Sequence, residues 1–295
     1  MTSTEWTVSA VIPTIGRPEL RLAVESALRQ TEHLLEVIVA ADTDHELDLP
    51  DDSRVIVIRT GPRAGGNVAR MAGIRAARGE LIALLDDDDE WMPDKLARQI
   101  LAVQSAGAHD VPWISSTLVL EPSGRAWPER RLAPGEPLPS YLFRKDRVKA
   151  GQGAMHTSTL LFPRSLAIEI PFDESLRFHQ DIDWLIRVDR DATALRVTQV
   201  DAALTQLGEG GGSVSRGIAP ERSLEWAHDA LAHVDRRVRG DFLVTVTYFQ
   251  ACRHRRPGAA LRVLRSAYTW GRPGVRTAPS VLVLPLKVLT GKGIA

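Results

Sequence analysis

Four consecutive aspartates, Asp86 to Asp89, follow the apolar residues 81–85. Their carboxylates repel one another strongly, so the cluster is stable only where solvent or a cation compensates the charge. A solvated loop is one interpretation of such a charge run. The apolar run, however, is typical of a buried parallel strand, and α/β proteins bind ligands at the carboxyl ends of such strands. We therefore expect a hard metal ion at this edge, held by Asp86 and Asp88.

Two further polar residues follow predicted strands. Thr14 ends a segment at 7–14, and Asp42 follows a segment at 36–41. Each has an ordinary explanation by itself, because threonine after proline commonly ends a strand and Asp-Thr-Asp commonly forms a turn. The carboxyl ends of parallel strands meet at one sheet edge, so the three polar strand ends together indicate a ligand site.

The first hundred residues alternate strand and helix patterns. Apolar, β-rich runs predict strands at 7–14, 36–41, 54–59 and 80–85. Helical spacing predicts helices that open at Arg17-Pro18 and at Gly65-Gly66. The inward stripe of the second helix is expected at Val68, Met71, Ala72 and Ala76. This alternation predicts a doubly wound, parallel α/β sheet with right-handed crossovers.

Composition excludes several classes of protein. The 295 residues carry 37 basic and 37 acidic side chains, so no global field attracts nucleic acid. The single cysteine, Cys252, excludes an internal disulfide framework and most structural zinc sites. The first residues lack the basic and apolar regions of a secretion signal. We expect a cytoplasmic protein, either free or peripheral at the inner face of the membrane.

The order and spacing of four segments resemble the family 2 glycosyltransferases. These segments are residues 11–14, the strand that ends at Asp42, residues 66–80 and residues 85–96. The resemblance covers residues 8–215. It implies the GT-A fold, with a mostly parallel sheet in a Rossmann-like nucleotide-binding half and an acceptor-binding half. We expect a catalytic domain at 1–217, divided into halves at 1–105 and 106–217, and a basic, helical C-terminal extension at 218–295.

The resemblance implies roles for individual residues at the donor site. Thr14 and Asp42 would contact the nucleobase and Asp87 the ribose, while Asp88 would be the principal metal ligand, assisted by Asp86. Such oxygen ligands suit Mn²⁺ or Mg²⁺, which neutralises charge on the departing diphosphate. Met71 stands where many relatives have asparagine. The full set implied for the nucleotide is Pro13, Thr14, Asp42, Asn67, Arg70, Asp86 and Asp87.

A helix pattern follows His179, with Asp181 and Asp183 in its first turn. Electrostatic capping alone would explain the two carboxylates, because the helix dipole favours negative charge there. The resemblance instead implies Asp181 as the catalytic base, with Gln180 in the place of the usual glutamate. Asp183 and His179 are the reserve candidates.

The glycine-rich residues 207–216 are either a lid that closes on the donor or an ordinary linker. Relatives have a histidine in this region that helps to bind metal or diphosphate, and this sequence has none between His179 and His228. Ser213, Ser215 or Arg216 would then serve at the phosphates.

The chain beyond Pro220 has a helical pattern and an uneven charge. Residues 242–295 contain nine lysines or arginines and no carboxylate. The apolar segment 281–289 is far shorter than the roughly 20 residues that cross a bilayer. These helices either pack on the catalytic body or a second subunit, as in a homodimer, or contact an anionic membrane surface. We favour packing.

Together these features predict a metal-dependent, inverting glycosyltransferase that uses a nucleoside diphosphate sugar donor in a single in-line displacement. UDP is the favoured carrier and a thymidine carrier the other; the acceptor is a sugar, a lipid-linked sugar or a small molecule. A catalytically impaired GT-A protein that binds nucleotide sugar or acts as a scaffold is the alternative. A sugar-phosphate nucleotidyltransferase would have a glycine-rich loop after the first strand, and a dinucleotide oxidoreductase would have GxGxxG there. Residues 13–17 contain neither.

Overall fold

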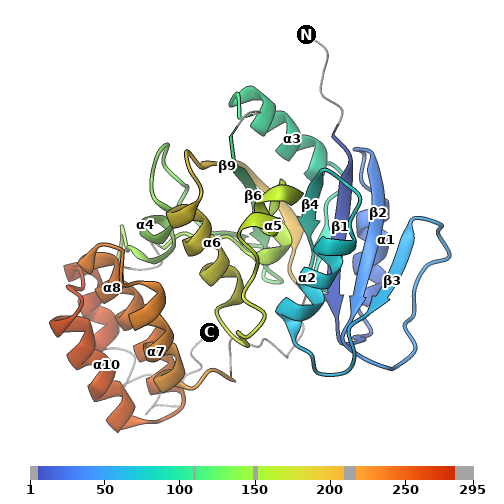
Figure 1. The fold of residues 1–295 in the computed structure, drawn as a ribbon. Helices are drawn as coiled ribbons and strands as arrows, with labels where there is room; N and C mark the ends of the chain where they lie inside the picture. Colours follow the sequence, from blue (N-terminus) through green and yellow to red (C-terminus); the bar gives the residue numbers. More distant parts are fainter. Residues whose placement is uncertain (1–5, 109–110, 149–151, 209–216, 283–295) are drawn as a thin grey trace. The chain divides into compact units, whose positions relative to one another are not determined.

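A computed structural model of the chain describes residues 6–108, 111–148, 152–208 and 217–282 (Figure 1). These residues form two compact units. The first contains the described parts of 1–131 and 155–211, and the second those of 132–154 and 212–295.

Within the described residues, the first unit contains one sheet of nine strands. The strands are β1 Val8–Thr14, β2 Leu34–Ala41, β3 Val55–Arg59, β4 Leu81–Leu84, β5 Glu90–Trp91, β6 Trp113–Leu120, β7 Ala126–Trp127, β8 Leu161–Pro163 and β9 Arg196–Gln206. Their order is β3–β2–β1–β4–β8–β6–β9–β5, with β7 paired to β6. The first four strands pair in parallel, as do β6 and β9, while β8 is antiparallel to both of its neighbours. The expected α/β, mostly parallel sheet is confirmed.

The helices of the first unit cover this sheet (Figure 1). They are α1 Leu20–Leu28, α2 Gly66–Ala76, α3 Lys95–Ser105, α5 Arg164–Glu169, α6 Gln180–Asp191 and the 3-10 turn η1 Thr157–Thr159. The helix expected to open at Arg17-Pro18 begins later, at Leu20, because a turn closed by Leu20 N–H and the Arg17 carbonyl (3.2 Å) comes first. Residues 157–163 form η1 and then β8.

The predicted inward stripe of α2 was also largely wrong. Val68 and Ala72 are only half-buried and Ala76 is exposed, whereas Asn67 and Arg70 are buried. The helix is covered on more than one side. Gly73 faces β1 so closely that a Cβ there would lie 2.5 Å from Val11 Cγ1, and Arg164 at the start of α5 donates to the Ile74 carbonyl at 2.9 Å. On the second side, Asn67 and Arg70 contact residues 172–173, which follow α5 and which the pattern of α2 alone does not encode.

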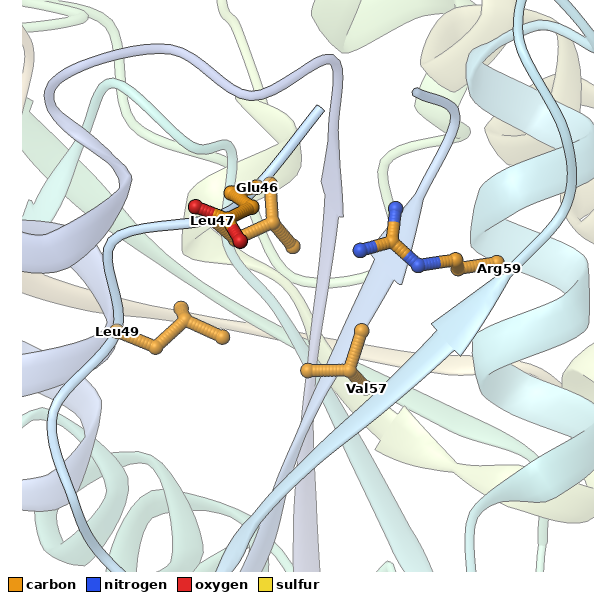
Figure 2. Close-up of a pocket in the computed structure, with 5 residues that line it drawn as sticks. All are labelled: Glu46, Leu47, Leu49, Val57 and Arg59. Atoms are coloured by element: carbon orange, nitrogen blue, oxygen red, sulfur yellow. The ribbon is translucent and has the colours of Figure 1, made fainter. Parts of the chain in front are cut away.

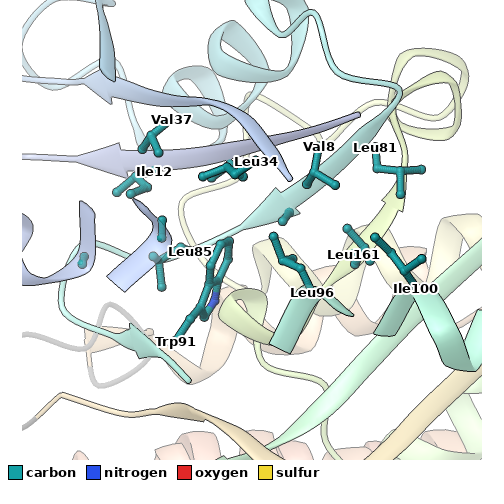
Figure 3. Close-up of a cluster of buried hydrophobic side chains, with 14 of the residues drawn as sticks. Val8, Ile12, Leu34, Val37, Leu81, Leu85, Trp91, Leu96, Ile100 and Leu161 are labelled. Atoms are coloured by element: carbon teal, nitrogen blue, oxygen red, sulfur yellow. The ribbon is translucent and has the colours of Figure 1, made fainter. Parts of the chain in front are cut away.

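One hydrophobic cluster joins the sheet to α1 and α3 (Figure 3). Ile12 and Leu85 from adjacent parts of the sheet share it with Trp91, while Leu96 and Ile100 bring in α3. Truncating such a fully buried leucine to alanine costs about 2–5 kcal/mol. The cluster therefore fixes the chain on both sides of the aspartate run.

The second unit is helical within the described residues. It contains α4 Leu138–Phe143, α7 Pro220–Ala230, α8 Arg236–Phe242, the π-helical segment η3 Leu243–Thr247, α9 Tyr248–Arg253, α10 Pro257–Thr269 and the 3-10 turn η4 Val275–Thr277. The Phe143 and Phe242 rings pack edge to face with their centroids 4.8 Å apart. None of the helices that the structure describes has both the length and the apolar character to span a bilayer. Most of the apolar segment 281–289 lies outside the described residues.

The buried carboxylate of Glu36 joins β1, β2 and the segment before β4 by hydrogen bonds. Glu36 on β2 accepts hydrogen bonds from Ser9 Oγ at 2.7 Å and from Arg78 N at 2.7 Å, and it pairs with the Arg78 guanidinium at 2.8 Å. Ser9 Oγ also accepts from Gly79 N at 2.9 Å. This network, made by residues of β1 and β2 with the segment before β4, supplies polar partners that the buried strands need.

Glu36→Gln should lower the free energy of unfolding by about 1–3 kcal/mol, because the hydrogen bonds from Ser9 and Arg78 are then no longer made to a charged acceptor. Burial raises the pKa of Glu36, but hydrogen bonds from the Arg78 backbone, Ser9 and the Arg78 side chain together lower it below its usual value. The stabilisation is therefore present above the unfolded-state pKa and is lost as the pH falls through the folded-state pKa. In urea titrations, the difference in the free energy of unfolding between wild type and Glu36→Gln should become smaller as the pH falls. A difference that stays constant with pH would contradict this assignment.

Candidate functional site

The four aspartates form a turn at the carboxyl end of β4. Leu85 N donates to the Val11 carbonyl at 3.1 Å and continues the pairing with β1 for one residue. Asp89 N then donates to the Asp86 carbonyl at 3.2 Å and closes the turn. The turn places four carboxylates at the edge where the parallel strands end.

Asp86, Asp89 and His156 form a cluster of ligand-type side chains. One ligand atom from each lies within 4.8 Å of the others. His156 precedes η1, and its Nδ1 is 3.5 Å from Asp89 Oδ2. Two carboxylate oxygens and an imidazole nitrogen are a donor set that divalent transition metals accept.

Burial disfavours the charges of this cluster. Burial raises the pKa of Asp86 to about 6, against the attraction of His156 and Arg70. Burial likewise raises the pKa of Asp89. Burial alone would lower the pKa of His156, but the surrounding carboxylates, Asp89 first, raise it above its usual value. The neighbouring carboxylates Asp88 and Asp89 also repel the charge of Asp86, and a bound cation would relieve this repulsion.

The other two aspartates of the turn contact the end of β1 and the loop after it. Thr14 Oγ1 donates to Asp87 Oδ2 at 2.5 Å, and it accepts from Gly16 N at 2.8 Å. Arg17 forms an ion pair with Asp88 and lies 3.3 Å from Asp87 Oδ1. Asp88, the expected principal metal ligand, is thus held by an arginine in this structure.

Asp42 connects the end of β2 with the start of α2. Its N–H donates to the Thr14 carbonyl at 2.8 Å, and its carboxylate accepts from Ala64 N at 2.6 Å and Gly65 N at 2.8 Å. Gly65 has a φ of 110°, and a Cβ there would collide with the Arg177 guanidinium. Pro13, half-buried on β1, lies beside Ala40.

Arg70 brings a buried guanidinium to the aspartate turn. Its Nη1 donates to Asn67 Oδ1 at 2.5 Å, and its Nη2 is 3.7 Å from Asp86 Oδ1. Asn67 Nδ2 in turn donates to the Asp173 carbonyl at 2.7 Å. The Arg70 guanidinium also lies 5.2 Å from the centre of the Phe172 ring. Of the predicted pair, Arg70 faces the acidic cluster and Asn67 holds it in place.

Asp181 lies in the first turn of α6 and contributes to the same electrostatic environment. Thr157 Oγ1 is 3.5 Å from Asp181 Oδ2, while Ile182 N donates to Oδ1 at 2.8 Å. The negative charge of Asp181 acts to raise the pKa of both His156 and Arg70. The expected base and the acidic cluster are therefore close enough to interact.

The two reserve candidates have other roles in the structure. Asp183 is buried and forms an ion pair with Arg187 at 2.8 Å. His179 has a left-handed backbone, with φ 53°, and burial lowers its pKa to about 4 despite the attraction of Asp181. A histidine with that pKa is neutral near pH 7, and Asp183 already has a cationic partner.

Sequence reasoning missed several contributors to the cluster. His156 and Ser158 precede the short strand β8, and no spacing in the sequence relates them to the aspartates. Arg17 was considered only as part of a helix start. Of the glycine-rich segment, Gly208 N donates to Asp89 Oδ1 at 3.1 Å, and a Cβ at Gly208 would lie 1.8 Å from the Asp88 carbonyl oxygen. The proposed lid beyond it, with Ser213, Ser215 and Arg216, lies outside the described residues.

A separate concavity of about 470 Å³ lies beside β3 (Figure 2). Its lining consists of Glu46, Leu47, Leu49, Val57 and Arg59. Arg59 Nη1 donates to the Thr43 carbonyl at 2.7 Å. No residue of the acidic cluster lines it, so the concavity is not part of that site.

The chain resembles several known proteins. It is 27% identical over 214 residues to the amylovoran biosynthesis glycosyltransferase AmsB of Erwinia amylovora, an alignment that covers 71% of this chain and 68% of AmsB. It is 40% identical over 82 residues to WfaP of Escherichia coli, a UDP-Glc:alpha-D-GlcNAc-diphosphoundecaprenol beta-1,3-glucosyltransferase, but that alignment covers only 26% of this chain and 33% of WfaP.

Solved structures share the fold. S. aureus TarS 1-349 in complex with UDP-GlcNAc matches with a TM-score of 0.57 and 14% identity, over 98% of this chain and 93% of that one. This likeness confirms the expected GT-A fold. A family model described as glycosyl transferase family 2 matches residues 9–169, more than half of the 295 residues. The chain therefore belongs to the family 2 glycosyltransferases.

Proposed function

We propose that this glycosyltransferase moves a sugar from a UDP-sugar to an acceptor hydroxyl by a single in-line displacement with inversion. The observation that carries the proposal is that the buried Arg70 of α2 lies 3.7 Å from Asp86 of the aspartate turn, and that burial lowers its pKa while the charges of Asp86 and of Asp181 on α6 act to raise it. Inverting transfer needs positive charge beside the leaving phosphate and a base beside the acceptor. This edge offers both.

The donor assignment rests on the residues around the end of β1. Thr14, Asp42 and Asp87 are connected by hydrogen bonds, so a nucleoside that contacts one of them meets a prearranged set. TarS, which shares the fold, has been solved with UDP-GlcNAc, and the name of WfaP gives UDP-glucose as its donor. Both support UDP as the carrier here. Arg70 is the cation that would face the diphosphate.

The cluster of Asp86, Asp89 and His156 fits a divalent ion such as Mn²⁺. Its donor atoms converge within 4.8 Å, and burial, which raises the pKa of both carboxyls, leaves a negative charge there that a cation would stabilise. When bound, the ion supplies charge neutralisation for the departing diphosphate. The ligand pair inferred from sequence, Asp86 and Asp88, stays a prediction, and it requires Asp88 to exchange its contact with Arg17.

Asp181 is our choice for the base that takes the proton of the acceptor hydroxyl. The Ile182 N–H holds one carboxylate oxygen, and Thr157 approaches the other. The alternative, an impaired protein that only binds nucleotide sugar, is favoured by the departures at Met71 and Gln180. Release of UDP from a panel of donors would reject it.

Although the sequence alone favours packing of the C-terminal helices, we further propose a lipid-linked acceptor presented at an anionic membrane surface. The name of WfaP gives a diphosphoundecaprenol-linked acceptor for that relative. In this chain, Leu261, Arg265 and Tyr268 occupy one exposed stripe of α10 at helical spacing. The nine cations of 242–295 have no carboxylate within that segment. An apolar and basic stripe of this kind suits an interfacial helix.

Asp86→Asn should abolish Mn²⁺-dependent binding of UDP, because this residue belongs to both candidate ligand sets. His156→Gln should weaken Mn²⁺ binding by at least about tenfold, and Asp88→Asn by less, if the convergent cluster holds the ion. Isothermal calorimetry with and without chelator measures these effects. If Asp88→Asn weakened Mn²⁺ binding more than His156→Gln, the ligands would be Asp86 and Asp88. If UDP bound equally well with chelator present, the proposed metal site would be wrong.

Asp181→Asn should lower kcat by about 10²–10⁴, the usual contribution of a positioned acid or base, and leave UDP affinity nearly unchanged. The readout is sugar transfer alongside calorimetric UDP binding. Asp183→Asn provides the comparison on the same helix turn. Loss of transfer there, with Asp181→Asn active, would move the role to Asp183.

The enzyme should sediment with phosphatidylglycerol vesicles at low salt and not with phosphatidylcholine vesicles. Arg265→Gln should weaken this binding about fivefold, since each basic residue near an anionic surface contributes about 1 kcal/mol. Arg262→Gln is the matched control, because Glu221 already pairs with Arg262 at 3.0 Å. Absence of sedimentation, or a concentration-dependent dimer that hides α10, would support packing instead.

A further inference from the structure

Lys95, the first residue of α3, is a fully buried lysine. Its Nζ donates to Gln99 Oε1 at 2.8 Å and lies 4.3 Å from the centre of the Trp91 ring. Among the described residues, no carboxylate forms an ion pair with it. Burial disfavours an ammonium that has no carboxylate partner, and it lowers the pKa of Lys95 well below its usual value. Such a costly residue needs an explanation beyond core packing.

Lys95 and two backbone carbonyls together fix the direction of the Gln99 amide. Gln99 Nε2 donates to two carbonyls, that of Ser115 at 3.0 Å and that of Thr159 at 2.9 Å. A carbonyl can only accept, so the amide nitrogen must face the two carbonyls, and the amide oxygen is then left to accept from Lys95 Nζ. With the amide reversed, an oxygen would stand against two carbonyl oxygens and a nitrogen against the ammonium.

The second neighbour of Lys95 acts on the same turn. Trp91 Nε1 donates to the Ser158 carbonyl at 2.7 Å. Lys95 therefore touches Gln99 and Trp91, which hold the consecutive carbonyls of Thr159 and Ser158. Thr205 Oγ1 also donates to the Ser158 carbonyl, at 3.2 Å. These two residues end η1, and an isolated three-residue 3-10 turn has little stability of its own.

The turn η1 carries groups of the acidic cluster. Ser158 Oγ donates to Asp89 Oδ2 at 2.5 Å and accepts from Asp86 N at 3.0 Å. His156 is the residue immediately before η1, and Ser158 N is 3.4 Å from its Nδ1. The position of η1 therefore affects all three candidate ligands. His156 is joined to it directly, Ser158 Oγ holds the Asp89 carboxylate, and the same oxygen holds the backbone N–H of Asp86.

We propose that Lys95 and Gln99 are positioning residues: with Trp91 they clamp η1, and through Ser158 and His156 they hold the acidic cluster in the geometry that binds the cation. The consequence for the cation rests on the function proposed above, whereas the clamp itself does not. Neither side chain touches substrate or the reacting atoms. Their effect reaches the site through backbone carbonyls of the turn.

Hydrogen–deuterium exchange tests the clamp without any ligand. In Lys95→Met and in Gln99→Met, the amides of Thr159 and Leu160, which bond back to His156 and Thr157, should exchange faster than in wild type. Thermal unfolding of Lys95→Met should be unchanged or shifted upward, because a buried charge is replaced by an apolar group of similar length. The double variant removes both buried polar groups and serves if Gln99→Met alone folds poorly.

Ser9→Ala is the matched control, since it removes a fully buried hydroxyl from the Glu36 network instead. It should lower stability and leave exchange at Thr159 and Leu160 unchanged. Unchanged exchange at these amides in Lys95→Met and the double variant would overturn the clamp. So would the same increase in Ser9→Ala, since general loosening would then explain it.

Calorimetry with Mn²⁺ alone tests the consequence. Lys95→Met and Gln99→Met should bind Mn²⁺ about tenfold more weakly than wild type, as when a group that orients a metal ligand is removed. Ser9→Ala should bind like wild type. Wild-type affinity in variants whose turn exchanges faster would overturn the link between clamp and cation. If the wild-type protein itself binds no Mn²⁺, the proposed metal site fails, and exchange still decides whether the clamp exists.

Discussion

The carboxylates after β4 repel one another where burial already disfavours their charge, and the surrounding structure supplies the opposing forces. Burial is the largest influence raising the pKa of Asp86, Asp87 and Asp89. The compensation comes from different elements: arginines after β1 and on α2, a histidine before η1, and donors from the end of β1, η1 and the end of β9. Each contact is short-ranged, so each of these elements must be held near the same turn.

The sheet makes this convergence possible. Parallel pairing of β1, β2 and β4 delivers Thr14, Asp42 and the aspartates to one edge. The antiparallel strand β8 then lies between β4 and β6, so that the residues just before it reach the same place from the opposite chain direction. The two ends of β1 have different roles. Near its start, Ser9 belongs to the hydrogen-bond network of Glu36, which stabilises the sheet. At its end, Thr14 contacts Asp87 in the aspartate turn.

The sequence predicted features that depend on residues close together in the chain, and it missed features that depend on residues far apart in the chain. The aspartate edge was predictable because an apolar strand and the charges after it are adjacent in the chain, and because parallel strands end at a common edge. The burial of Asn67 and Arg70 was not, because Phe172 and Asp173, more than a hundred residues later, contact them. His156 and Ser158 were missed for a similar reason: their relation to Asp86 and Asp89 depends on an inserted three-residue strand that carries no periodicity. The domain limits and the site roles inferred from resemblance stay predictions.

Gly208 has a consequence for motion at this edge. Its α-carbon is packed so closely against the Asp88 peptide that no side-chain atom fits between them, and its N–H is bonded to Asp89. The end of β9 and the aspartate turn are therefore mechanically linked by direct backbone contact. Any shift of Gly208 must either break this contact or displace the carboxylates with it, so the position of Gly208 and the geometry of the charges cannot vary independently.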